Sequence, residues 1–326
     1  MTRRPASRRP PRLTDAQIRT AGADAAHSTA RTGRADRAAP MRGMINASSA
    51  QQSAQMSSPM ALRELVTRTG VTGTHRNIGR AELTSIMRRL RDGDRPTWWG
   101  FDPVIGLGFD EVVEVAEALW GLRFTSHRCV LDPDITGARL RMGIERIEAV
   151  AAAGGRIAFA TGRPASLLSL YQALARRAGR AGANVLASAQ SSSFMAGKHG
   201  ARRLWWLEGV AVMTDGDDLL SGRAIEAGEE LLFWLPRPDL VVADSGFATC
   251  AVGAGIPTVA IADLDQLALG WAERRGDPVT IVPVDVACPP QAYALLLQWA
   301  EMLVQLPPAS NGGLDNFAIE AYHRRG

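Results

Sequence analysis

Residues 156–164 read Arg-Ile-Ala-Phe-Ala-Thr-Gly-Arg-Pro, and this stretch indicates the fold class. Its first five residues, 156–160, form a short and mostly apolar run with the length and character of a buried strand. The glycine lets the backbone turn tightly, and the proline suits the first turn of a helix, which we predict over 165–178. A buried strand that leads straight into a helix is the repeating unit of a parallel α/β sheet.

Short apolar runs alternate with helical segments along the rest of the chain as well. The further strands that we predict lie at 183–187, 209–214, 239–243, 257–261 and 279–283. The further helices that we predict lie at 137–153, 247–254, 265–275 and 291–305. This alternation predicts a Rossmann-like, three-layer α/β fold with a mostly parallel sheet, which we place at residues 126–306.

The segments on either side of this predicted domain have a different character. Residues 60–125 show apolar positions at helical spacing, with helices predicted over 80–91 and 109–120, so we expect a small, mainly helical region there. Residues 307–326 begin with two prolines and contain Asn-Gly-Gly, which predicts a loose C-terminal tail.

The positive charge of the chain is concentrated in residues 1–59. This segment has ten Arg, three Asp and no Lys or Glu, so it carries +7 and leaves −3 for the remainder of a chain with net charge +4. It has almost no aromatic or branched aliphatic residues, so we expect a disordered arm. Two interpretations stay open, an arm for an anionic partner such as nucleic acid or lipid, and a solvated tail. Because no aromatic residues interleave with the arginines, the composition favours the solvated tail. Apart from this arm, we expect no part of the chain to bind nucleic acid.

Composition excludes several classes of protein. Hydrophobic residues make up 46% of the 326 residues, enough for a sizeable core. No apolar stretch reaches the roughly 18 residues that cross a bilayer, and no apolar segment follows the N-terminal arginines as in a secretory signal. Three widely separated cysteines fit a reducing compartment and show no metal-ligand spacing. We expect a cytoplasmic protein without a membrane partner.

Three of the predicted strands end in polar residues that suit a phosphate site. Thr161, Gly162 and Arg163 follow the first strand, with Ser166 one turn further on; a helix N-terminus beside a hydroxyl and a guanidinium can cradle a phosphate. The alternative is an ordinary strand–helix turn that Thr161 caps.

Asp244 and Asp263 end two strands that are consecutive in the sequence and therefore neighbours in a parallel sheet. Two carboxylates at one sheet edge can hold Mg²⁺, which prefers oxygen ligands. The alternative is that each aspartate caps the helix that follows it.

Residues 132–136 read Asp-Pro-Asp-Ile-Thr, 29 residues before Thr161. Together with Ala-Thr-Gly-Arg at 160–163, this string resembles the first two motifs of haloacid dehalogenase-type phosphatases. The resemblance implies that Asp132 is the nucleophile, that Thr161 binds the phosphoryl group and that Asp244 holds Mg²⁺. The alternative is that residues 132–134 form a turn before a helix.

A broader resemblance covers residues 62–300. The chain is similar to an actinobacterial family of proteins known simply as phosphatases, without a defined substrate. The stretches that carry the resemblance are His75-Arg76-Asn77, residues 91–100, Phe159 to Pro164, Pro238 to Phe247, and Ala262 to Asp265.

These observations predict a metal-assisted phosphatase that acts on a small phosphorylated metabolite. Mg²⁺ is expected near Asp244 and Asp263, with Thr161, Gly162 and Arg163 on the phosphoryl group, and either a metal-bound water or Asp132 as nucleophile. The residues expected to close the site from the helical region are Arg76, Asn77 and Trp98. The alternative is a non-catalytic α/β module that binds a phosphorylated small molecule or phosphosugar in the same cradle.

Overall fold

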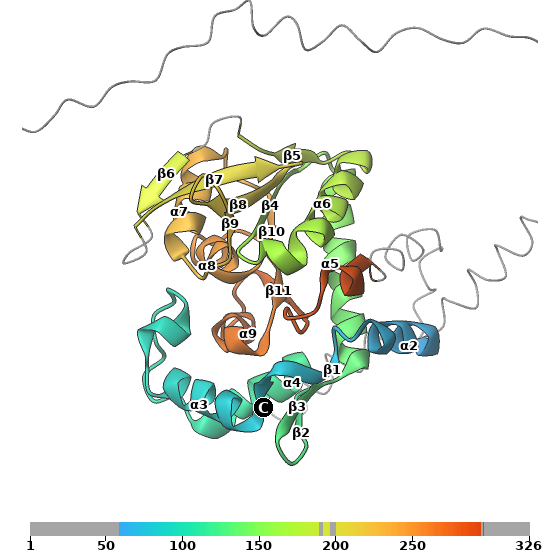
Figure 1. Ribbon diagram of the computed structural model, residues 1–326, viewed down its shortest axis with the longest axis vertical. Helices are drawn as coiled ribbons and strands as arrows, with labels where there is room; N and C mark the ends of the chain where they lie inside the picture. Colours follow the sequence, from blue (N-terminus) through green and yellow to red (C-terminus); the bar gives the residue numbers. More distant parts are fainter. Residues whose placement is uncertain (1–58, 189–191, 196–199, 295, 297–326) are drawn as a thin grey trace, which may run out of the picture. The chain divides into compact units, whose positions relative to one another are not determined.

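The computed structural model describes residues 59–188, 192–195, 200–294 and 296 (Figure 1). The C-terminal tail predicted at 307–326 lies outside the described residues, as does the predicted arm apart from Pro59, the first residue of a helix. The domain limits at residues 125 and 306 stay predictions.

A nine-stranded sheet forms the centre of the described part, in the order β12-β11-β10-β4-β8-β7-β6, with β5 paired to β4 and β9 paired to β8. Its strands are β4 (Arg156–Thr161), β5 (Asn184–Leu186), β6 (Ser192–Met195), β7 (Ala201–Leu207), β8 (Val210–Thr214), β9 (Leu219–Leu220), β10 (Leu240–Ala243), β11 (Thr258–Ala262) and β12 (Val279–Pro283). Strands β12, β11, β10, β4, β5 and β8 pair in parallel, while β6, β7 and β9 pair antiparallel. The mostly parallel sheet predicted from the sequence is confirmed.

The order of the strands reverses at β4. From β4 the chain adds β5 and β8 on one side, and it then returns to the other side of β4 to add β10, β11 and β12. Ala243 of β10 lies opposite both Ala160 of β4 and Ala260 of β11, so the carboxyl ends of these strands are level. Such a reversal point is where open α/β sheets bind their ligands.

Helices cover both faces of the sheet, which gives the three layers predicted (Figure 1). Side chains alternate along β4: Ile157 and Phe159 pack on one face, and Ala158 and Ala160 pack on the other. The first face is covered by α5 (Pro133–Ala152) and α6 (Pro164–Arg180). The second face is covered by α7 (Ile225–Trp234), α8 (Ser245–Gly253) and α9 (Leu267–Arg274), together with α3 (Arg80–Arg91) and α4 (Phe109–Trp120).

A second, three-stranded sheet has the order β1-β3-β2, with both pairings antiparallel. Its strands are β1 (Gly73–Gly79), β2 (Arg123–Phe124) and β3 (Arg128–Leu131). The region predicted to be mainly helical contains β1 as well as α2 (Pro59–Thr69), α3 and α4. Strand β1 was missed because it reads Gly-Thr-His-Arg-Asn-Ile-Gly, a polar sequence without the apolar alternation of a strand.

The remaining differences are small. Strands β2, β3, β6, β7 and β9 and helix α7 were not predicted, and Trp98 lies in a short 3₁₀ helix, η1 (Arg95–Trp98). Residues 290–294 are helical, as predicted from 291 onward, and residues 297–305 lie outside the described part. Among the described helices, none combines the length and apolar character that a membrane span needs.

Candidate active site at the carboxyl edge of the sheet

Four adjacent parallel strands each deliver a buried polar residue to the carboxyl edge of the sheet. Strand β4 ends in Thr161, Asp244 and Asp263 directly follow β10 and β11, and Asp285 comes two residues after β12. All four side chains belong to residues that are at most 4% exposed. Burial of so many carboxylates is costly unless each one is hydrogen bonded or paired with a cation.

Asp244 is completely buried and connects β10 to β4. Its Oδ2 accepts a hydrogen bond from the Thr161 hydroxyl at 2.5 Å, and its Oδ1 accepts one from the Gly162 N–H at 2.8 Å. Burial raises the pKa of Asp244, and these bonds offset part of the rise. The Thr161 hydroxyl also accepts the Arg163 N–H at 3.0 Å. The cradle predicted for a phosphate therefore holds the Asp244 carboxylate.

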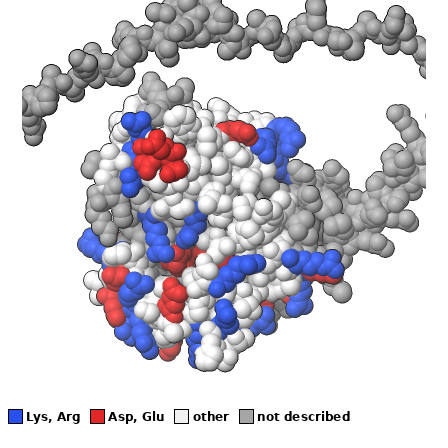
Figure 2. All heavy atoms as spheres, in the orientation of Figure 1, with Lys and Arg blue, Asp and Glu red and all other residues white. Residues whose placement is uncertain are grey.

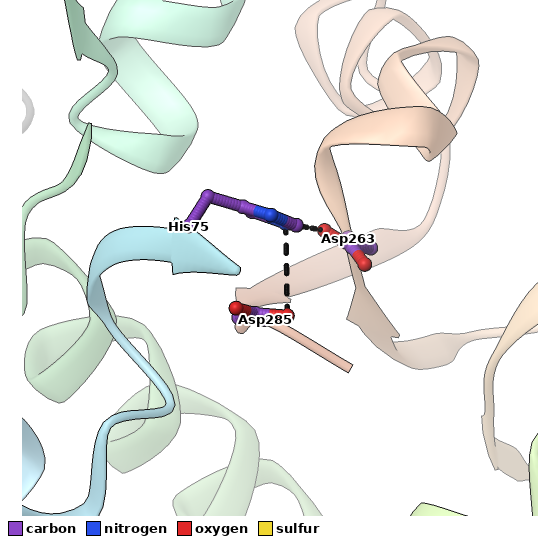
Figure 3. Close-up of side chains that lie close together, drawn as sticks. All are labelled: His75, Asp263 and Asp285. Atoms are coloured by element: carbon purple, nitrogen blue, oxygen red, sulfur yellow. Dashed lines mark hydrogen bonds and ion pairs between the residues drawn. The ribbon is translucent and has the colours of Figure 1, made fainter. Parts of the chain in front are cut away.

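His75, Asp263 and Asp285 form a second buried group, and one possible metal-ligand atom from each lies within 4.8 Å of the others. Figure 3 shows the ring of His75 pointing from β1 toward the two carboxylates. The His75 Nε2 is 2.6 Å from Asp263 Oδ1 and 3.8 Å from Asp285 Oδ1. An imidazole and two carboxylates are groups that ligate metal ions in proteins.

Backbone groups hold this second cluster in place. Asp285 accepts the Arg76 N–H at 2.8 Å and the Ala287 N–H at 3.0 Å. Asp263 caps the short helix η3 (Leu264–Gln266), where its Oδ1 accepts the Leu264 N–H at 2.7 Å. The cluster therefore joins β1, β11 and the segment after β12 into one site.

The backbone around His75 also fixes where its proton lies. The Nδ1 atom accepts the N–H groups of Ile78 at 3.0 Å and Asn77 at 3.2 Å, so Nδ1 carries no proton in this arrangement. The proton of the neutral ring is then on Nε2, which donates it to Asp263.

Asp265 forms a third charged group beside the cluster. Its Oδ2 accepts hydrogen bonds from Arg163 at 3.0 Å and from Arg223. Burial and the nearby Asp263 charge raise the pKa of Asp265, while both guanidinium groups oppose the rise. Arg223 also stacks on the Trp99 ring at 4.8 Å, and the Trp99 indole donates to the Asp265 carbonyl. Near the middle of the face in Figure 2, acidic side chains lie between basic ones.

Buried polar atoms without a hydrogen-bond partner gather at this edge. Among the described residues, such atoms are Arg163 Nε, Tyr171 Oη, Ser245 Oγ, Asp265 Oδ1 and Gln266 Nε2, together with two tryptophan nitrogens, Trp206 Nε1 and Trp271 Nε1. Arg163, Asp265 and Gln266 lie just after the ends of β4 and β11, whereas the hydroxyls of Tyr171 and Ser245 lie against the Asp244 carboxyl. Buried groups of this kind are rare in folded proteins and indicate a place that a ligand completes.

The structure shows where the four further residues lie that were predicted to bind the substrate or close the site. Trp98 is fully buried in the core and donates to the Leu90 carbonyl, while its neighbour Trp99 reaches Asp265. Arg76 contributes its backbone N–H to the site, and Asn77 does so through His75. The Ser166 hydroxyl donates to the Arg163 carbonyl at 3.4 Å.

The structure does not support the role that the dehalogenase resemblance gave to Asp132. This residue follows β3 of the small sheet, not a strand of the central sheet. Its side chain caps α5 by accepting the Asp134 N–H at 2.8 Å, and it pairs with Arg123 at 3.3 Å. The alternative, a turn over residues 132–134 before a helix, is also not what forms: Asp132 is the N-cap, and Pro133 and Asp134 already belong to the first turn of α5.

Two residues of the site were not among the predicted metal ligands. Asp285 follows a predicted strand, so the strand-end argument applied to Asp244 and Asp263 points to it as well. His75 lies in a stretch without a recognisable strand, and only the family resemblance drew attention to it. Asp263, which was predicted to hold a metal together with Asp244, lies instead with His75 and Asp285 in the group that could hold a metal ion, whereas Asp244 hydrogen bonds to Thr161 and Gly162.

Comparison with known proteins agrees with the family resemblance. A family model described as Phosphatase matches residues 57–304. Phosphatase SCO2771 of Streptomyces coelicolor is 30% identical over 213 residues, which cover 62% of this chain and 79% of the relative. The match includes β1 and every strand end that supplies the site. The chain therefore belongs to the Phosphatase family and is a phosphatase.

Proposed function

We propose that the enzyme hydrolyses the phosphomonoester of a small metabolite with the help of Mg²⁺ held by Asp263 and Asp285. The observation that carries this proposal is the excess of buried carboxylates at the carboxyl ends of β10, β11 and β12, next to the strand β4 at which the order reverses. These carboxylates belong to Asp244, Asp263, Asp265 and Asp285. Among the described residues, Arg163 and Arg223 pair with Asp265, while the neutral ring of His75 contacts Asp263 and Asp285. A divalent cation would balance the remaining negative charge.

The donor set fits Mg²⁺. Each carboxylate already accepts backbone N–H groups, which fix its orientation and leave further lone pairs for an ion. Mg²⁺ binds through one or two protein carboxylates and keeps several waters. When bound, the ion would supply Lewis-acid stabilisation of charge on the phosphoryl oxygens.

His75 fits as a positioning residue for Asp263 rather than as a third ligand. A metal-bound histidine usually donates its second N–H to a carbonyl or carboxylate. Here Nδ1 faces two N–H donors, so Nε2 keeps its proton and holds Asp263. Rotation of the ring by 180° would put a carbon atom, not a nitrogen, where Nε2 lies.

The phosphoryl group would be recognised by donors that have no hydrogen-bond partner among the residues that the structure describes. Arg163 Nε and Gln266 Nε2 are buried without one, and the Arg163 and Arg223 guanidinium groups crowd onto a single oxygen of Asp265. A phosphate offers more acceptor sites than this one oxygen, and arginine binds phosphate in a bidentate manner.

Phosphate release from a general aryl phosphate and from a panel of phosphorylated metabolites tests the proposal, with Mg²⁺ and with a chelator. We expect turnover that needs Mg²⁺ and that falls at least about 100-fold in Asp263→Asn and Asp285→Asn. Asp217→Asn is the matched control, because Asp217 lies exposed in a turn after β8.

Two results would contradict the proposal. One is phosphate release at the same rate with and without the chelator. The other is thermal stabilisation by a phosphorylated ligand without any release of phosphate, which is the behaviour of the non-catalytic binding module.

A further inference from the structure

Ser245 has an unusual backbone conformation at the end of β10. Its φ is +53°, and among the described residues only Trp99 and Glu208 share a positive φ without being glycine. The left-handed region strains an L-residue, and strained residues persist mostly at functional sites. Glycine would adopt this positive φ without strain, so the serine at this position points to a role for its side chain.

The Ser245 hydroxyl is also buried, in a residue that is 1% exposed. It lies against the Asp244 carboxyl and lowers the pKa of that group through a hydrogen bond. It also faces Gly162, where an added Cβ would lie 3.2 Å from Oγ. Ser245 begins the nine-residue helix α8, whose free N–H groups favour an anion at this end.

We infer that Ser245 Oγ is the nucleophile that takes the phosphoryl group from the substrate. This inference rests on the proposed function and assigns its reacting atom. It combines a strained strand–helix turn, a buried hydroxyl within hydrogen-bond reach of a carboxylate that can take its proton, and a helix N-terminus.

The reaction then has two displacements. In the first, Ser245 Oγ forms a bond to phosphorus, the bond between phosphorus and the ester oxygen breaks, and the alcohol leaves. The hydroxyl proton passes to the Asp244 carboxylate and from there to the departing alkoxide. In the second, water attacks the phosphoserine, inorganic phosphate leaves, and the Ser245 hydroxyl is restored. No oxidant or other co-reactant is needed.

A short segment covers Ser245 in this structure. Residues 221–224 have no regular secondary structure, and the Gly222 N–H donates to the Gly162 carbonyl at 2.9 Å. The Ala224 carbonyl would lie 2.3 Å from a Cβ on Gly246. The Arg223 side chain is 60% exposed and anchors the segment on Asp265 and Trp99. The inference therefore requires that this segment moves aside to admit a substrate.

Substitution of Ser245 by glycine tests the inference without endangering the fold. Ser245→Gly removes the hydroxyl and relieves the positive φ, so we expect an unchanged or higher melting temperature and a loss of phosphate release of about 1000-fold or more. Glu208→Gly relieves the same strain at an exposed turn, and its activity should equal that of the wild type. A Ser245→Gly variant within threefold of wild-type activity would overturn the inference.

The stereochemical course at phosphorus gives an independent readout on the wild type. Two displacements through phosphoserine give overall retention of configuration with a chiral phosphomonoester. Inversion means a single attack by water and overturns the inference even where Ser245→Gly is inactive. A wild-type protein that releases no phosphate from any substrate contradicts the proposed function instead, so the two failures are distinguishable.

Discussion

Single side chains at the carboxyl edge are held by backbone groups from remote parts of the sequence. Asp285 accepts the N–H of Arg76, which is 209 residues away, and His75 contacts Asp263 across 188 residues. None of these side chains is oriented by its own strand alone. The site therefore forms only when β1 packs against the ends of β11 and β12. Enzyme activity then depends on this packing.

Asp132 gives a prediction that separates capping from catalysis. Asn caps a helix about as well as Asp, so Asp132→Asn should keep full phosphatase activity. Asp132→Ala removes the cap and should lower the free energy of unfolding by about 1 kcal/mol. Chemical denaturation and a phosphate-release assay on both variants check this. Loss of activity in a stable Asp132→Asn protein would restore the nucleophile role.

Asp239 gives a prediction about acid stability. Hydrogen bonds from the Arg156 side chain and backbone lower the pKa of Asp239 to about 2. The folded pKa is below the unfolded value of about 4, so the pair stabilises the fold above pH 4 and loses this effect as the pH falls toward 2. Asp239→Asn should therefore melt at a lower temperature than the wild type at pH 7, and the difference should shrink below pH 4. A pH-independent difference would count against this account.

Helix α8 illustrates how closely the elements pack around the site. A Cβ on Gly246 would meet the backbone of Ala224 and Ile225 within 3 Å, whereas a Cβ on Gly253, in the same helix, would meet nothing within 4 Å. The first glycine is needed for α8 to approach the segment before α7. The second has no such contact.

Alanine at these two positions should therefore have opposite effects. Gly246→Ala should lower the free energy of unfolding by about 1–3 kcal/mol, because backbone atoms have to shift. Gly253→Ala should be neutral or raise it by up to about 1 kcal/mol through helix propensity. Equal effects in urea denaturation would show that the approach of α8 to residues 224–225 is looser than described.

Arg223 gives a prediction for the segment that covers Ser245. Arg223→Ala removes the hydrogen bond to Asp265 and the stacking on Trp99. We expect a higher KM for phosphorylated substrates, since Arg223 is one of the groups that we propose to bind phosphate. The melting temperature should change little because the side chain is mostly exposed. Arg176→Ala, in an exposed pair with Glu208, is the control and should leave KM unchanged. An unchanged KM in Arg223→Ala would remove Arg223 from substrate binding.

The architecture of the whole molecule was predictable where burial imposes a pattern. Strand β12 and helices α3 and α4 have the bounds predicted from the sequence, because an apolar run or an apolar helix face marks each of them. Strand β1 has two buried residues in seven and no apolar run, so its pairing with β3 is a tertiary effect that local sequence does not encode.

The site was predictable in part for the same reason. A parallel sheet predicts that aspartates at the ends of its strands lie near one another. It does not predict which residues contact these aspartates. The bond from Thr161 to Asp244 and the contact from His75 to Asp263 depend on which loops meet at the edge. Trp98 and Trp99 are adjacent in the sequence, and only the three-dimensional fold shows that the second one reaches the site.

The charge distribution over the whole chain gives one more prediction. Removal of residues 1–56 takes away ten Arg and three Asp and changes the net charge from +4 to −3. Since the family match begins at residue 57, the shortened protein should release phosphate at the wild-type rate. Any binding of the full chain to nucleic acid at physiological salt should disappear with the arm. If the shortened protein still binds nucleic acid, the binding does not depend on the arginines of residues 1–56.

The most direct test of a metal-assisted site at Asp263 and Asp285 is phosphate release from an aryl phosphate during a Mg²⁺ titration. We predict that the wild-type rate rises with Mg²⁺ to saturation, and that Asp285→Asn needs at least about tenfold more Mg²⁺ to reach half of its own maximum. A wild-type rate that does not depend on Mg²⁺, or a variant with the same Mg²⁺ requirement as the wild type, would contradict the claim.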